Sequence, residues 1–271
     1  LISNKNSSGE YYLTDMIAIA HEKGIAIATA KAESEMEVLG VNNRMQQAML
    51  ERYFQQSIAE DLMVNGVTMM DPMRFDCRGS ITVGRDVYID VNCVFEGEVK
   101  LGNGVVVGPN CVIKNAVIGD NTVIKANSMI DDATVAADCE VGPYARLRPG
   151  TELQTGAKIG NFVETKKALI GVNSKVNHLS YVGDTVVGSN CNLGAGVITC
   201  NYDGANKFKT EIGNNVFVGT NTALVAPVTL ADGSTTGAGS VISNSVGKDQ
   251  LAVTRAKQRN IDGWVRPSKK R

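Results

Sequence analysis

This sequence of 271 residues lacks several features, and each absence excludes a class of protein. No apolar run approaches the roughly 20 residues that a helix needs to cross a bilayer, and the N-terminus carries no basic, apolar, cleavable signal. The six cysteines lie far apart without a Cys-x-x-Cys pair, which argues against zinc and dithiol redox motifs. Lysine plus arginine (27) nearly equals aspartate plus glutamate (28), so charge favours neither nucleic acid nor a membrane surface. We expect a cytoplasmic protein with reduced thiols and neither of those partners.

Histidine is also scarce, with only His21 and His178 present. Thr14 and Asp15 are capping residues at the start of an apolar stripe, which predicts a short helix that ends near Gly24. His21 is then expected to be a surface or half-buried helix residue. Residues 25–30 read as a strand, but residues 1–44 offer too few elements for a core of their own. We expect them to be the C-terminal remnant of an α/β domain.

One long helix is predicted next. Residues 43–63 contain no proline or glycine, and their apolar residues recur at steps of three and four, which is typical of an amphipathic helix. Asn65-Gly66 ends it. We therefore expect a linker helix over residues 45–65 and a further domain over residues 66–271. The apolar stripe consists of Met45, Met49, Leu50, Tyr53, Phe54, Ile58 and Leu62.

A six-residue repeat runs from near Gly79 to about residue 245, with occasional steps of five. A bulky apolar residue and a small residue two positions before it share one face, because strand side chains alternate. Short strands with a turn in every repeat indicate a parallel β-helix, in which residues about 18 apart lie above one another at roughly 4.8 Å. Small inward positions include Cys111, Cys139 and Cys191, which we interpret as core residues.

Stacking brings two cations together on the outside of this tube. Arg148 and Lys166 each follow an inward position and lie one full coil apart, with no slip in the repeat between them. Two unpaired cations so close together repel, so an anion between them, such as a phosphate or pyrophosphate, is a sensible explanation. Two solvated cations that point apart remain the alternative. Tyr181 and Asn192 also face outward, because each immediately precedes an inward residue.

The repeat is interrupted once at length, by the loop over residues 200–210. A loop of this size on a regular solenoid is either functional or decorative. Its tyrosine, asparagines and lysines favour a function, and it leaves the tube one coil beyond Lys166. We expect it to cover the same outer surface.

The histidine within residues 177–184 completes a chemical hypothesis. Acyl transfer from a thioester to an amine needs a base for the amine proton and donors for the tetrahedral oxyanion. His178 is suited to be that base, because histidine titrates near neutral pH. Glu164 is a candidate to orient its imidazole. A structural turn histidine is the alternative for His178.

The repeat resembles that of the hexapeptide-repeat acyltransferases, which implies a mainly β fold, a left-handed parallel β-helix. Four motifs and the loop over residues 200–210 together are similar to one family, the bacterial bifunctional N-acetylglucosamine-1-phosphate uridyltransferases and glucosamine-1-phosphate acetyltransferases. The resemblance covers essentially the whole chain. The motifs lie at residues 146–150, 160–167, 177–184 and 192–196.

The resemblance implies roles for individual residues. It makes His178 the proton acceptor in acetyl transfer from acetyl-CoA to glucosamine 1-phosphate, and it places Lys207 near the substrate. The family position at Thr220 is often serine, which keeps the hydroxyl. The sugar phosphate or nucleotide product is expected to contact Arg148, Lys166, Tyr181 and Asn192. Acetyl-CoA is expected to contact Ala195, Asn201, Tyr202, Thr220, Ala238 and Arg255.

The resemblance also implies a uridyltransferase domain before the linker helix. The full-length protein would use UTP to convert the acetylated product to UDP-N-acetylglucosamine for cell-wall synthesis. Its glycine-rich nucleotide loop is missing here, so we expect the chain to be an N-terminally truncated fragment without that activity. The residue matching Asn42 binds Mg²⁺ in the family. A lone asparagine cannot hold Mg²⁺, which also needs carboxylate and phosphate oxygens.

The family forms homotrimers with acetyl-CoA sites between adjacent prisms. The basic tail over residues 255–271 is either a disordered solubilising end or a coenzyme A contact. For Arg255 and Lys257 we favour contact with coenzyme A phosphates, which need cations.

Two other classes of protein compete with this interpretation. A metal-dependent hydratase such as a γ-class carbonic anhydrase needs three histidines on the repeats, and only His178 lies there. A purely structural or surface-binding solenoid would not need the stacked cations, the single corner histidine or the polar loop.

Overall fold

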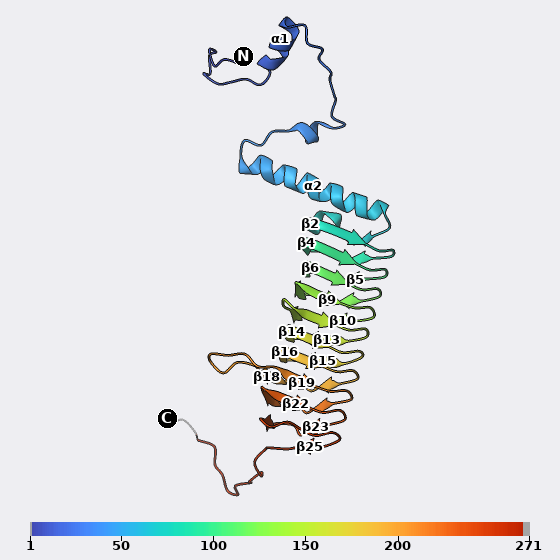
Figure 1. Ribbon diagram of the computed structural model, residues 1–271, viewed down its shortest axis with the longest axis vertical. Coiled ribbons are helices and arrows are strands. Elements are labelled where there is room, and N and C mark those ends of the chain that lie inside the picture. The colour runs from blue at the N-terminus through green and yellow to red at the C-terminus, as the bar shows by residue number, and fades with distance from the viewer. Residues whose placement is uncertain (1, 268–271) are drawn as a thin grey trace. The chain divides into compact units, whose positions relative to one another are not determined.

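The structure is a computed structural model that describes residues 2–267 (Figure 1). Its contacts divide the chain into two compact units, Leu1–Glu51 and Arg52–Arg271. Helix α2 (Arg44–Val64) contributes residues to both units. No helix among residues 2–267 has the length and apolar character needed to span a membrane.

The first unit contains little regular structure. It holds α1 (Asp15–Glu22), the 3-10 helix η1 (Glu35–Val38) and the beginning of α2. The predicted helix is confirmed, and His21 is exposed in its last turn. The predicted strand over residues 25–30 is wrong, because no strand in the described part of this unit is available to pair with it, and an isolated strand leaves its backbone groups unpaired.

Helix α2 has the predicted length, but only part of the predicted apolar stripe, Ile58 and Leu62, packs against the core. Within the second unit its buried residues are Gln55, Ala59 and Leu62, whereas Tyr53 and Phe54 of the predicted stripe are exposed. The Gln55 side chain accepts a hydrogen bond from Cys77 N (2.6 Å) and donates one to Cys77 O (2.9 Å). An edge strand presents backbone donors and acceptors that need partners. A glutamine supplies both, so a polar residue faces the first coil.

The strands of the second unit pair in parallel, and the coils stack from β2 to β25 (Figure 1). A short 3-10 helix, η2 (Pro72–Arg74), precedes β2. One face of the prism is an 11-stranded sheet made of β1 (Thr68–Met69), β3 (Tyr88–Ile89), β5 (Val106–Val107), β7 (Val123–Ile124), β10 (Glu140–Val141), β13 (Lys158–Asn161), β15 (Lys175–His178), β17 (Asn192–Leu193), β20 (Phe217–Val218), β23 (Thr235–Thr236) and β25 (Leu251–Ala252).

The other two faces form one 14-stranded sheet, because several long strands continue around the corner between them. Strand β6, for example, pairs with β8 at one end and with β9 at the other. The strands are β2 (Phe75–Val83), β4 (Cys93–Leu101), β6 (Val112–Ile118), β8 (Met129–Asp131), β9 (Ala133–Val135), β11 (Arg146–Leu147), β12 (Thr151–Leu153), β14 (Glu164–Ile170), β16 (Tyr181–Val187), β18 (Ile198–Cys200), β19 (Thr210–Ile212), β21 (Ala223–Val225), β22 (Val228–Leu230) and β24 (Val241–Ile242).

The predicted inward positions form the core. Leu147, Ile159 and Leu193 are almost fully buried, as the period of six requires. The repeat begins earlier than predicted, because Phe75 and Cys77 pair with Cys93 and Phe95 of the next coil.

The cysteines confirm the prediction of core positions. Cys111, Cys139 and Cys191 are buried free thiols. Burial raises the pKa of each of them, and it raises the pKa of Cys93 to about 12. A thiol that stays protonated is a poor nucleophile and metal ligand. These residues therefore fill space in the core.

Glu140 carries a pH-dependent part of the stability. Its carboxylate lies between Lys125 (2.6 Å) and Lys158, and these hydrogen bonds lower its pKa to about 2. A carboxyl group whose pKa is lower in the folded state stabilises the protein above its unfolded pKa, near 4.5, and that contribution disappears as the pH falls toward 2.

We expect Glu140→Gln to lower the free energy of unfolding at pH 7 by at most about 1 kcal/mol, since the group is partly exposed, and to lower it less at pH 3. Urea unfolding of both proteins at the two pH values tests this. Glu152→Gln is a control, because exposed Glu152 forms no ion pair within residues 2–267. An equal loss at both pH values would contradict the role of the charge.

Candidate active site

Five residues occupy equivalent positions on successive coils at one edge of the prism. Asn161 pairs with His178 in the ladder, and backbone hydrogen bonds continue this alignment, from Gly196 N to His178 O (3.1 Å), from Asn221 N to Ala195 O (2.7 Å) and from Gly239 N to Thr220 O (2.8 Å). We call this line the His178 edge. It consists of Asn161, His178, Ala195, Thr220 and Ala238.

The His178 edge joins two sets of sequence predictions. The expected proton acceptor lies in line with three of the six residues expected to contact acetyl-CoA. A fourth, Arg255, donates a hydrogen bond from Nη1 to the carbonyl oxygen of Ala238 (3.1 Å). Thr220, Ala238 and Arg255 are all exposed, so this edge is accessible to a ligand in the isolated chain.

The imidazole of His178 is exposed at the end of β15 and has one hydrogen-bond partner in the described chain. Its Nδ1 lies 2.6 Å from Oδ1 of Asn161, at the end of β13 on the preceding coil. Sequence reasoning missed Asn161. One coil of three repeats, of which one has five residues instead of six, separates Asn161 from His178. Counting back by that coil would have found Asn161.

Arg148 and Lys166 stack as predicted. Leu147 pairs with Thr165, and Arg148 N donates to Thr165 O (2.9 Å). The prediction of two unpaired cations is half wrong, because Nη1 of Arg148 lies 2.6 Å from Oε1 of Glu164. Glu164 therefore holds Arg148, not the imidazole of His178.

Of the two stacked cations, Lys166 has no ion pair within residues 2–267, whereas Arg148 has one. The charges of Lys207 and then Arg148 lower its pKa. Like charges lower the pKa of a lysine because they disfavour its protonated form. Lys207, from the polar loop, is therefore close enough to Lys166 for their charges to repel. An anion bound here would relieve this repulsion.

The loop is a hairpin that leaves the coil between β18 and β19 (Figure 1). Tyr202 and Lys207 form an antiparallel bridge, and the carboxylate of Asp203 accepts hydrogen bonds from the backbone of Ala205 (2.8 Å) and Asn206 (2.6 Å). These contacts fix the turn. The loop thus presents Lys207 from an ordered segment.

Asn201 and Tyr202 differ in exposure. The side chain of Asn201 is buried and donates to Asp184 Oδ2, while its carbonyl accepts from Phe208 N (2.9 Å). Tyr202 is 59% exposed. Asn201 therefore anchors the base of the loop, whereas the ring of Tyr202 is exposed and its hydroxyl donates to Gly204 O.

Tyr181 and Asn192 face outward as predicted but lie on different faces. Tyr181 begins β16, beside Glu164 of β14, whereas Asn192 begins β17 in the 11-stranded sheet. The phenol of Tyr181 lies over the backbone of Gly183, where any side chain would collide with it. The His178 edge is the convex corner between these two faces, so one chain does not bring both residues to a single point.

Bulky apolar side chains accompany this edge. Tyr144, Phe162 and Leu179 all have positive φ and are more than half exposed, and the rings of Tyr144 and Phe162 stack with centroids 5.3 Å apart. Most other non-glycine residues with positive φ are asparagine or aspartate, which tolerate this conformation better. Exposed apolar side chains in strained conformations favour a surface that is covered in an assembly.

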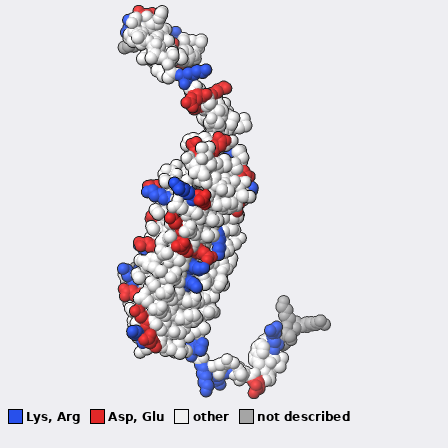
Figure 2. Space-filling view, turned by 90° about the vertical axis from the view of Figure 1, so that its right-hand side faces the viewer, with Lys and Arg blue, Asp and Glu red and all other residues white. Residues whose placement is uncertain are grey.

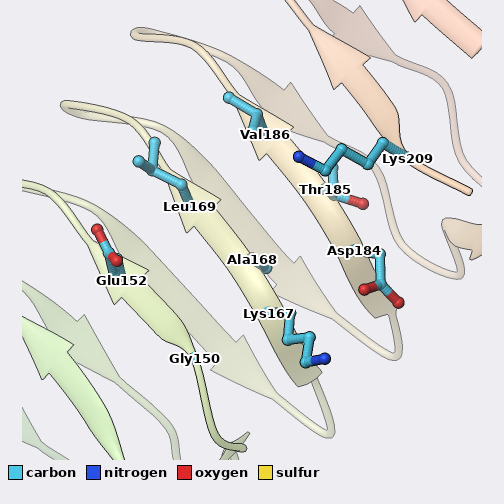
Figure 3. A pocket seen from close by; sticks show the side chains of 9 residues that line it. All are labelled: Gly150, Glu152, Lys167, Ala168, Leu169, Asp184, Thr185, Val186 and Lys209. Carbon is cyan, nitrogen blue, oxygen red and sulfur yellow. The ribbon is translucent and has the colours of Figure 1, made fainter.

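A neighbouring depression has a different character (Figure 3). It lies on the outside of β12, β14 and β16, where Lys167 and Asp184 stand near one end and Glu152 near the other. None of the predicted site residues lines it, and its two lysines are balanced by two carboxylates. On the face drawn in Figure 2, basic and acidic side chains are likewise interspersed along the β-helix. This pattern gives no support to a nucleic-acid surface.

The residues around Asn42 do not fit a magnesium ion. The Asn42 backbone N–H donates to Gln46 Oε1 (2.8 Å), and no group of three or more His, Cys, Asp or Glu side chains suited to a metal occurs in the described part of the chain. Mg²⁺ requires an octahedral set of oxygen ligands that includes carboxylates or phosphates. We therefore assign no metal chemistry to these residues.

Comparison with known proteins identifies the class first. Residues 77–151 match the GMPPB C-terminal domain, and residues 209–244 match the bacterial transferase hexapeptide family with six repeats. The structure of Arabidopsis UDP-N-acetylglucosamine acyltransferase aligns with a TM-score of 0.52 at 16% identity, over 67% of this chain and 70% of that chain. The protein is a left-handed parallel β-helix of hexapeptide repeats, as predicted.

Curated relatives then identify the family. The chain is 58% identical over 268 residues to the bifunctional protein GlmU of Marinobacter nauticus and 63% identical over 269 residues to that of Cellvibrio japonicus. Each alignment covers 99% of this chain and 59% of the relative. The chain belongs to the family of bifunctional GlmU proteins and spans about three fifths of their length.

Proposed function

We propose that this chain transfers the acetyl group of acetyl-CoA to the amine of glucosamine 1-phosphate and thereby forms N-acetylglucosamine 1-phosphate. One observation carries the proposal: His178 lies on the same edge as Ala195, Thr220 and Ala238, next to the outward face that holds Lys166. In this arrangement His178 would lie between the thioester of acetyl-CoA, bound along the edge, and the anionic sugar phosphate, bound beside the edge at Lys166. The curated relatives support the proposed acetyl transfer. They are named GlmU, and GlmU is the family that the sequence motifs resemble.

The reaction needs only one proton acceptor. Nε2 of His178 removes the proton from the amine as the nitrogen attacks the thioester carbonyl, and the new C–N bond gives a tetrahedral oxyanion. Collapse of this intermediate breaks the C–S bond, and the departing coenzyme A thiolate takes up a proton. Backbone N–H groups stabilise such an oxyanion when no other acceptor occupies them. Ala195 N–H, one coil from His178, makes no hydrogen bond within residues 2–267.

The phosphate of the substrate accounts for the cations. Lys166, Lys207 and Arg148 form a group of like charges, of which Arg148 already has Glu164 as a partner. A phosphate dianion between Lys166 and Lys207 would form charge-assisted hydrogen bonds and remove their repulsion. The phosphate position would also present the amine of the sugar toward the His178 edge.

A second copy of the chain is needed to complete the site, and we propose a homotrimer with sites between adjacent prisms. Tyr181 and Asn192 lie on different faces of a convex corner, so a ligand can contact both types of residue only where two prisms meet. The exposed side chains of Tyr144, Phe162 and Leu179 beside this corner favour burial against a neighbour.

The complete protein would catalyse two reactions in the cytoplasm. We propose that its other half uses UTP and Mg²⁺ to convert the acetylated product to UDP-N-acetylglucosamine for cell-wall synthesis. The described residues of this chain do not form the metal site of that half.

Release of free thiol from acetyl-CoA tests the proposed function. The chain is incubated with acetyl-CoA and either glucosamine 1-phosphate or glucosamine, and the thiol is measured with a chromogenic disulfide. We expect release that depends on the sugar phosphate and is much slower with glucosamine. A structural or surface-binding β-helix would give no release above the spontaneous hydrolysis of the thioester, and that result would reject the proposal.

Arg255 provides a prediction for acetyl-CoA. We expect Arg255→Ala to raise the KM for acetyl-CoA by about tenfold, because a hydrogen bond between charged groups contributes about 1.5–3 kcal/mol when it is formed in full. Steady-state kinetics with varied acetyl-CoA measures this change. Arg85→Ala is the matched control, since Arg85 is an exposed arginine on an early coil. An unchanged KM for acetyl-CoA in Arg255→Ala would reject the contact.

A further inference from the structure

We propose that Asn161 is a positioning residue for His178. Its amide oxygen accepts a hydrogen bond from Nδ1–H of the imidazole and thereby leaves the lone pair of Nε2 free to take the amine proton. This inference rests on the proposed acetyl transfer and names a further residue that the reaction needs.

The backbone fixes both side chains at the same level of the edge. Asn161 and His178 are ladder partners at the ends of β13 and β15, and Leu179 N donates to Asn161 O (3.0 Å). With both Cα atoms held by strand pairing, the distance of 2.6 Å between Nδ1 and Oδ1 is a property of two adjacent coils. An exposed loop would not hold the two groups in this way.

The imidazole has no other hydrogen-bond partner within residues 2–267. Glu164, the carboxylate that the sequence offered for this task, is held by Arg148 (2.6 Å) and lies near Arg146 (3.5 Å). The imidazole of an exposed histidine without a partner populates both tautomers and several orientations. The hydrogen bond at one ring nitrogen selects which nitrogen carries the proton.

The choice of asparagine has a chemical consequence. A carboxylate at this position would favour the imidazolium, which cannot accept a proton, whereas an amide oxygen orients the neutral ring without adding charge. The arrangement therefore favours a neutral, correctly oriented base at the edge where the amine arrives.

The sequence makes a direct test practical, because it contains only two histidines. The protein is labelled with ¹⁵N-histidine, His21→Gln assigns the signals, and the ¹⁵N shifts of the neutral ring report which nitrogen carries the proton. We expect Nδ1 of His178 to be protonated and Nε2 to be free. Asn161→Ala should give a mixture of both tautomers. A ring protonated at Nε2 in the unmodified protein would overturn the proposal, because Asn161 would then be the donor.

Kinetics supply the second readout. We expect Asn161→Ala to lower kcat by about 10–100-fold, a part of the 10²–10⁴-fold that a general base contributes, with little change in the KM for glucosamine 1-phosphate. Asn161→Asp should keep the neutral ring protonated at Nδ1, since its carboxylate accepts the same hydrogen bond, but it should recover only part of kcat, because the carboxylate also favours the imidazolium. Asn214→Ala is the control, because Asn214 is a corner asparagine whose side chain accepts from Ser189 N (2.9 Å) on another edge. It should change neither kcat nor the His178 signals.

The outcomes separate this inference from the proposed function. If the unmodified protein releases no thiol from acetyl-CoA, the acetyl transfer fails, whatever the tautomer. If it is active and Asn161→Ala keeps both its kcat and the Nδ1-protonated ring, the positioning role alone is rejected.

Discussion

His178→Ala is expected to lower kcat for acetyl transfer by about 10²–10⁴-fold, which is the usual contribution of a general base. The amine must lose a proton as it attacks the thioester, and the structure offers His178 at the edge where the reactants are proposed to meet. The KM values for both substrates should change little, since the base acts mainly in the transition state. Steady-state kinetics with glucosamine 1-phosphate and acetyl-CoA provide the measurement.

His21 is the natural control for this experiment. It is exposed on α1 in the first unit, and His21→Ala should retain the kcat of the unmodified protein. A loss of less than about threefold in His178→Ala would be too small for a general base and would remove His178 from the mechanism.

Lys166→Met is expected to raise the KM for glucosamine 1-phosphate by about 10–100-fold, with the KM for acetyl-CoA unchanged. Removal of a hydrogen bond to a charged group costs about 1.5–3 kcal/mol, and Lys166, unlike Arg148, has no ion-pair partner in the described chain. Methionine keeps most of the length of the side chain. The loss should therefore reflect the charge and its hydrogen bonds.

The next residue provides a matched control. Lys167 follows Lys166 directly but lines the depression on β12, β14 and β16 instead (Figure 3). Lys167→Met removes the same charge from nearly the same place in the sequence and should leave the KM for glucosamine 1-phosphate within about twofold. Equal effects of the two substitutions would show that only the general positive charge matters, and the phosphate site would then be wrong.

The regular part of the fold could be predicted because its period is visible. Each coil repeats the same pairs of small and bulky residues, so the stacking of Arg148 on Lys166 followed from a count of one whole coil with no slip. The length of α2 followed in the same way from its uninterrupted pattern. Predictions about which side chains pack against each other were less accurate, because no regular period in the sequence indicates such contacts. The stripe expected to pack is largely exposed, and Gln55 takes its place.

The His178 edge was hidden because the spacing along it is irregular. The steps between its successive members are not all equal, and the loop over residues 200–210 causes the longest of them. Side-chain partners were equally out of reach of the sequence. Glu164 lies two positions before Lys166 and looked available to His178, but the ladder places it beside Arg146, within reach of Arg148.

A crystal structure of the protein with coenzyme A and glucosamine 1-phosphate tests the central claim most directly. We predict that the phosphate lies between Lys166 and Lys207, that coenzyme A follows the His178 edge, and that the amine lies about 2.6–3.2 Å from Nε2 of His178. A sugar phosphate bound away from Lys166, or an amine directed away from Nε2, would contradict the account.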